Sequence, residues 1–119
     1  MNLVAFLGTD KENWGQITAL INRMEDCEKV LLFRNKSAEN FPATENCEIV
    51  EIDSSLPLMQ MQKQIQEKVK SYFKDDFEIA LSLASGTGKE HMALISAVLS
   101  APMGIKLVAF TKNGIEFLS

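Results

Sequence analysis

The sequence predicts an α/β fold in which a mostly parallel sheet lies between two layers of helices. Short apolar runs alternate along the chain with segments that carry apolar residues at helical spacing. The first run, residues 3–7, is apolar throughout, which indicates a strand buried on both faces. Asn113-Gly114 predicts a tight hairpin near the end of the chain. Together these features predict a Rossmann-like three-layer sandwich with a C-terminal antiparallel edge hairpin.

Length and charge limit the classes of function. The chain has 119 residues, which fit one domain spanning residues 1–119, and its net charge is −4. Lysines and carboxylates are interspersed, so the sequence lacks the basic face that a duplex nucleic-acid binder needs. We therefore expect no duplex nucleic acid as a partner, whereas a small anionic ligand in one local pocket remains compatible with this charge.

The N-terminus and the cysteines bear on location and metal binding. Residues 1–8 lack the basic segment and cleavage site of a signal peptide, and no apolar run reaches the roughly 18 residues of a membrane span. Cys27 and Cys47 have no metal-ligand spacing, and the chain has one histidine. We expect a cytoplasmic protein with reduced thiols, no membrane contact, no metal site and no cofactor.

The elements follow from turn residues, capping signals and apolar spacing. The predicted strands are residues 3–7, 30–33, 48–52, 78–83, 106–111 and 115–118. Residues 34–48 are polar and form a crossover with one helical turn near residues 37–41. Capping boxes at Thr9/Glu12 and Thr87/Glu90 open the first and third helices, and Pro57 lies near the start of the second. The stripes expected to face inward are Trp14, Ile17, Ile21 and Met24; Leu58, Met61, Ile65, Val69 and Tyr72; and Met92, Ile95, Ser96 and Leu99.

The most informative motif is the glycine turn, residues 85–89, between the fourth strand and the third helix. A helix N-terminus has free N–H groups and about half a positive charge, which suits a phosphate or another anion. We expect Gly86→Val to harm ligand binding more than stability, because the backbone must approach the phosphate. The alternative is a structural capping turn with a solvated Lys89. The turn is no Walker A loop, since Glu90 stands where that motif needs Ser or Thr, and it is no Gly-x-Gly-x-x-Gly fingerprint.

The loop after the first strand is the second candidate segment. Ligands of open α/β sheets bind beyond the carboxyl ends of the strands, where the strand order reverses. If the first and fourth strands are neighbours, Thr9 and Asp10 line the same crevice as the glycine turn. Trp14 could stack on a base, although its place in an apolar stripe also fits core packing. His91 lies in the first turn of the third helix and faces either the crevice or the solvent.

This layout resembles the CARF domain, the CRISPR-associated Rossmann fold, in a stand-alone form. The resemblance rests on the first-strand loop, on residues 83–93 around the glycine turn and on the final strand pair, residues 104–118. The family more often has Gly-Gly-Thr-Lys, then one residue, then Met. Here Thr87 and Gly88 are exchanged and Met92 comes one residue later.

The resemblance implies a function. CARF domains are homodimers that bind cyclic oligoadenylates, the messengers of type III CRISPR defence, across the dimer cleft. Some members cleave the ring without metal, by attack of a ribose 2′-hydroxyl on the adjacent phosphate. Thr9 and Lys89 would then be the catalytic residues that stabilise the developing charge. The candidate ligand-binding residues are Thr9, Asp10, Trp14, Ser85, Gly86, Thr87, Gly88 and Lys89.

Three hypotheses stay open at this stage. The first is a dimeric sensor or metal-independent ring nuclease for cyclic oligoadenylate. The second is a non-catalytic ligand-sensing or interaction module that regulates a separate effector. The third is a small α/β interaction protein whose glycine turn is only structural.

Overall fold

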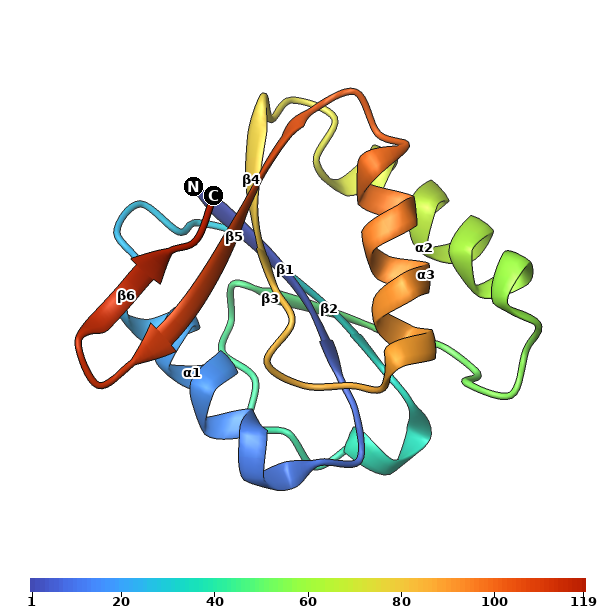
Figure 1. Cartoon of the computed structure of the whole chain (residues 1–119), viewed down its shortest axis with the longest axis horizontal. Coiled ribbons are helices and arrows are strands. Elements are labelled where there is room, and N and C mark those ends of the chain that lie inside the picture. Colours follow the sequence, from blue (N-terminus) through green and yellow to red (C-terminus); the bar gives the residue numbers. More distant parts are fainter.

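A six-stranded sheet forms the centre of the computed structural model, which describes residues 1–119 (Figure 1). The strand order is β3-β2-β1-β4-β5-β6; β6 pairs antiparallel with β5, and all other pairs are parallel. The predicted Rossmann-like α/β fold with a C-terminal edge hairpin is confirmed. The strands are β1 (Asn2–Leu7), β2 (Val30–Arg34), β3 (Cys47–Glu51), β4 (Glu78–Ser82), β5 (Gly104–Thr111) and β6 (Gly114–Phe117).

Helices cover both faces of the sheet and complete the three layers. Helix α1 (Trp14–Arg23) lies on one face, and α2 (Leu58–Tyr72) and α3 (Gly88–Leu99) lie on the other (Figure 1). Short 3₁₀ turns at Lys11–Asn13 and Lys36–Ala38 follow β1 and β2. None of the helices has the length and apolar character needed to cross a membrane.

Alternate residues of the central strands pack into two separate cores. In β1, Val4 and Phe6 pack with α2 and α3, whereas Leu3, Ala5 and Leu7 pack with α1. All five side chains are fully buried. A strand covered on both faces needs apolar residues at every position, which explains the uninterrupted apolar run in the sequence.

The neighbouring strands β1 and β4 set the position of the candidate site. They pair in parallel from Asn2 with Ile79 to Ala5 with Ser82. The chain leaves β1 toward β2 on one side and leaves β4 toward β5 on the other. The strand order therefore reverses between them, and the loops that follow β1 and β4 meet at the edge where α/β sheets bind ligands.

The inward face predicted for α3 is wrong. Met92 and Leu99 are 56% and 69% exposed, and Ile95 and Ser96 are only partly buried. Alanines on the other side let α3 approach the sheet more closely than the larger side chains would allow. The residues of α3 that are buried are Glu90, Ala93, Leu94, Ala97 and Val98. We call Met92, Ile95, Ser96 and Leu99 the outer stripe of α3.

Candidate ligand-binding site

Two glycines bring the loops after β1 and β4 into direct backbone contact. A Cβ atom built on Gly8 would lie 2.8 Å from the Cα of Gly86, a distance that real Cβ atoms do not tolerate. The hydroxyl of Ser85 also accepts a hydrogen bond from the Gly8 N–H, at 2.9 Å. The first loop and the glycine turn are therefore packed and hydrogen-bonded together, as expected if β1 and β4 are neighbours.

The carboxylate of Asp10 joins the same two loops. Its Oδ1 accepts from the Ser85 hydroxyl at 2.7 Å and from the Gly86 N–H at 3.1 Å, and its Oδ2 accepts from the Asn13 amide at 2.8 Å. Partial burial by itself would raise the pKa of Asp10, but the hydrogen bonds outweigh it and hold the pKa below its ordinary value. The Asp10 carboxylate therefore holds the loop after β1 against the glycine turn.

The predicted capping box at the start of α3 is confirmed. The Thr87 hydroxyl accepts from the Glu90 N–H at 3.2 Å, and the Thr87 N–H donates to Oε1 of Glu90 at 2.8 Å. Gly86 precedes the cap with a φ of +110°, a conformation that favours glycine. His91 donates from Nε2 to the carbonyl of Ser85 at 2.8 Å, so its ring faces the turn.

Two N–H groups of the turn are left without a partner. Carboxylates already occupy the N–H groups of Gly86 and Thr87, whereas no hydrogen bond engages those of Gly88 and Lys89. Gly88 is exposed, and a Cβ built on it would meet nothing within 4 Å. The open, anion-attracting part of the turn is therefore Gly88 and Lys89, at the first two positions of α3.

Lys89 reaches back across the site. Its ammonium donates to the carbonyl of Ser54 at 2.9 Å, in the loop that joins β3 to α2. An ammonium has three protons, so one hydrogen bond to a neutral carbonyl leaves two protons for an anion. The residue is partly buried, and its ammonium lies against the β3–α2 loop at Ser54.

The first loop departs from the sequence-based expectation at Thr9. The side chain of Thr9 makes no hydrogen bond and caps no helix: the cap residue of the 3₁₀ turn is Asp10, and α1 begins only at Trp14. The capping box predicted at Thr9 and Glu12 is therefore wrong, because the chain first makes a 3₁₀ turn. Thr9 is exposed and its hydroxyl is free.

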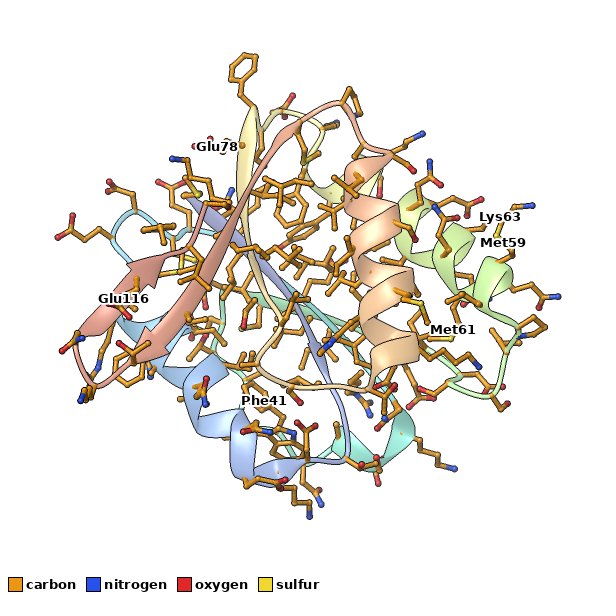
Figure 2. The ribbon with its side chains drawn as sticks, viewed as in Figure 1. Phe41, Met59, Met61, Lys63, Glu78 and Glu116 are labelled. Carbon is orange, nitrogen blue, oxygen red and sulfur yellow. The ribbon has the colours of Figure 1, made fainter.

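Trp14 supports the first loop from the side of α1. Its indole N–H donates to the carbonyl of Gly8 at 3.1 Å, and its ring meets Phe41 edge to face with centroids 5.8 Å apart. Phe41 lies beside α1 in Figure 2. Core packing, one of the two roles that the sequence allowed for Trp14, is therefore present in the structure. Base stacking by Trp14 stays a prediction.

The structure adds three residues that the sequence analysis did not single out as site residues. Glu90 is 2% exposed, and its Oε2 accepts from the hydroxyl of Ser54 at 2.7 Å and from the amide of Asn35 at 3.2 Å. Asn35 and Ser54 follow β2 and β3. A search of the sequence for polar residues directly after each predicted strand could have found them. They border a polar cavity of about 460 Å³, lined by Asn35, Lys36, Ser37, Glu51, Ile52, Asp53, Ser54 and Ser55.

A second surface feature lies beside the turn. The outer stripe of α3 borders an apolar groove of about 400 Å³ whose other wall is the start of α2, with Leu58, Met59 and Gln62. Met59 is 65% exposed on α2, whereas Met61 is fully buried; both are labelled in Figure 2. The groove begins within one helical turn of Lys89, since Met92 is part of it.

Comparison with known proteins identifies the fold. No family model and no curated protein matches the chain. A solved structure of Enterococcus italicus Csm6 bound to cyclic hexa-2′-fluoro-hexa-dAMP matches 90% of this chain with a TM-score of 0.64 at 16% sequence identity. The chain has a CARF-like fold. This CARF-like chain corresponds to 32% of the length of that Csm6.

Proposed function

We propose that this chain binds a cyclic oligoadenylate, the second messenger of type III CRISPR defence, in a cleft between two copies. One observation carries the proposal. A turn with two free N–H groups and a lysine stands at the carboxyl ends of β1 and β4. The fold that presents this turn is shared with a Csm6 that was solved bound to a cyclic hexanucleotide.

The turn offers a phosphate diester two free N–H groups, and the Lys89 side chain can supply a third donor from the Ser54 side of the site. The N–H groups of Gly88 and Lys89 point outward from the positive end of α3, and the Lys89 ammonium adds a full charge. Asp10 and Glu90 stay bonded to the inner N–H groups. Asp10, Ser85, Gly86 and Thr87 then shape the pocket, while Gly88 and Lys89 contact the phosphate.

The same geometry is compatible with cleavage of the ring. A ribose 2′-oxygen bonds to the adjacent phosphorus, the bond to the 5′-oxygen breaks, and the products are a 2′,3′-cyclic phosphate and a 5′-hydroxyl that takes up the proton. Lys89 stabilises the charge that develops on the phosphate, and the free hydroxyl of Thr9 is the second donor. This scheme relies on positioning and electrostatics and needs no histidine base.

The outer stripe of α3 supports the two-fold cleft. A single glycine turn contacts one side of a cyclic ligand, so enclosure requires a second turn. The exposed Met92 and Leu99 lie on the helix that begins at the turn, and with Met59 they form an apolar surface beside it. Pairing of two such surfaces buries this apolar area and brings two Lys89 turns to one ligand.

Incubation with cyclic tri-, tetra- and hexa-adenylate in EDTA tests the proposal. We expect thermal stabilisation by at least one ring, and chromatography reports linear products if the ring is cleaved. A ring whose 2′-hydroxyls are replaced by fluorine is the matched control, because it binds but cannot undergo the 2′-attack. Stabilisation by no ring would refute the proposal.

A non-catalytic module that regulates a separate effector is the second candidate. It is favoured by the carbonyl of Ser54, which draws the Lys89 ammonium toward the β3–α2 loop. Under this alternative the natural ring and its fluorinated analogue bind equally well, and both are recovered intact after long incubation.

A further inference from the structure

Glu90 is the one acidic residue of the protein that is almost completely buried. The residue is 2% exposed, and its carboxylate lies within hydrogen-bonding distance of three donors. Oε1 accepts from the Thr87 N–H at 2.8 Å, and Oε2 accepts from the Ser54 hydroxyl at 2.7 Å and the Asn35 amide at 3.2 Å. Burial of a carboxylate is costly unless its oxygens are hydrogen-bonded, and here both are.

The three donors come from three different loops. Asn35 follows β2, Ser54 lies between β3 and α2, and Thr87 follows β4. A capping box needs only one oxygen of Glu90, so the contacts of the second oxygen are not required to start the helix. Those contacts tie the glycine turn to the two loops that border the polar cavity.

Ser54 connects this network to Lys89. Its hydroxyl donates to Glu90 while its carbonyl accepts from the Lys89 ammonium at 2.9 Å. Movement of Ser54 would therefore move the acceptor that holds Lys89. The side chains of Lys89 and Glu90, neighbours in sequence, are fixed against the same residue of another loop.

We infer that Glu90 is a positioning residue, whose carboxylate holds Ser54 and the glycine turn together and thereby fixes the Lys89 ammonium at the Ser54 carbonyl. This inference deepens the proposed function, because it explains how the lysine that contacts the ligand is kept in place. The position of Lys89 itself can be tested without any ligand.

The hydrogen-bond partners of Glu90 explain why a carboxylate stands at this position. All three partners are donors, and a carboxylate can accept from each of them. In Glu90→Gln the amide NH₂ faces either the Thr87 N–H, where two donors oppose each other, or the Asn35 amide, which must then turn over and lose the hydrogen bond that its Oδ1 accepts from the Ser37 hydroxyl. The double variant Asn35→Asp with Glu90→Gln restores a carboxylate–amide pair with its direction reversed, while the hydroxyl of Ser54 can rotate to accept.

Acetylation of lysines in the ligand-free protein, followed by mass spectrometry, measures the position of Lys89 directly. Lys63 on α2 is exposed and serves as the internal standard. We expect Glu90→Gln to raise the acetylation rate of Lys89 relative to Lys63 at least about fivefold, the effect of one lost buried hydrogen bond. The reversed pair should return it to the parent value.

A second pair of variants covers the case in which Glu90→Gln does not fold. Ser54→Ala removes the hydroxyl bonded to Glu90 and keeps the carbonyl, whereas Ser71→Ala removes an exposed hydroxyl of α2 that is bonded only to the Lys68 carbonyl. Lys89 should be acetylated faster in the first variant and at the parent rate in the second. Unchanged acetylation of Lys89 in folded Ser54→Ala would overturn the inference.

Binding of the fluorinated ring adds a readout that a merely structural role would not change. If Glu90 acts through Lys89, Glu90→Gln lowers the affinity of the otherwise unchanged protein for the ring at least about fivefold. The same substitution added to Lys89→Ala then causes no further loss of affinity. Equal losses in both backgrounds contradict the inference. If the parent binds no ring, the proposed function fails, and the acetylation experiment still decides the role of Glu90.

Discussion

The two glycines of the turn should respond to alanine in opposite ways. Gly86 has a φ of +110°, and a Cβ there would lie 3.2 Å from Nε2 of His91 and 3.3 Å from Oε1 of Glu90. Forcing a non-glycine residue into such a conformation costs about 1–3 kcal/mol. For a chain of this size, that cost lowers Tm by roughly 3–15 °C. Gly88→Ala adds a methyl group in open space at the first position of α3, so stability should be unchanged or slightly higher.

Ligand binding should show the reverse order. The methyl group of Gly88→Ala stands where a phosphate approaches the free N–H groups, and one lost hydrogen bond to a charged group is worth about 1.5–3 kcal/mol. Affinity for the fluorinated ring should fall about tenfold or more. The sequence alone favoured Gly86 as the phosphate contact, but the Gly86 N–H already donates to Asp10.

Circular dichroism melts and titration of the fluorinated ring measure both effects on the same two variants. A Gly86→Ala protein that melts with the parent but no longer binds would refute this reasoning. It would show that the phosphate contacts Gly86 and that Asp10 is displaced by the ligand.

Three further changes test separate parts of the structure. Because the pKa of Asp10 is lowered from its ordinary value of 3.8 in the folded protein, its ionised carboxylate stabilises the fold at pH values above 3.8. This contribution is lost as the pH falls through the folded pKa. The difference in unfolding free energy between the parent and Asp10→Asn, measured with urea, should therefore shrink from pH 6 to pH 3. Gly8→Ala should lower the melting temperature, since its Cβ meets the Gly86 backbone at 2.8 Å; an unchanged melt contradicts the close contact. Met92→Glu should produce a monomer in sedimentation with little loss of stability, whereas a persistent dimer excludes the outer stripe as the interface.

The sheet was predictable because its signals are local. Apolar runs covered on both faces mark the strands, and Gly114, with a φ of +99°, turns the hairpin that Asn113-Gly114 predicted. The capping box at Thr87 and Glu90 also depends only on residues three positions apart. Features of this kind can be inferred from spacing alone.

The inward face of α3 was not predictable from spacing. Apolar residues surround this helix, so Met92 and Leu99 fit one stripe as well as Ala93 and Ala97 fit another. Only the close approach to the sheet, which favours small residues, selects between them. The stripe that sequence analysis placed inside therefore lies on the surface, and the proposed two-fold cleft rests on it.

The organisation of the site depends on contacts that are distant in sequence. The Asp10 carboxylate bonds to the glycine turn across more than seventy residues, and the second oxygen of Glu90 bonds to loops after two other strands. Local spacing predicted Thr9 as a cap, and the expected strand order together with the family resemblance gave Asp10 as a ligand contact; neither could show that the Asp10 carboxylate is already bonded to Ser85 and Gly86. The hydrogen bonds that join the candidate residues required the structure, and their contact with a ligand stays a prediction.

Calorimetric titration of the fluorinated cyclic hexa-adenylate, with the tri- and tetra-adenylate analogues in parallel, tests the central claim most directly. The account predicts saturable binding of at least one ring with one ring per two chains, and a large loss of affinity in Lys89→Ala. Absence of binding by every ring, or binding that Lys89→Ala leaves unchanged, would contradict it.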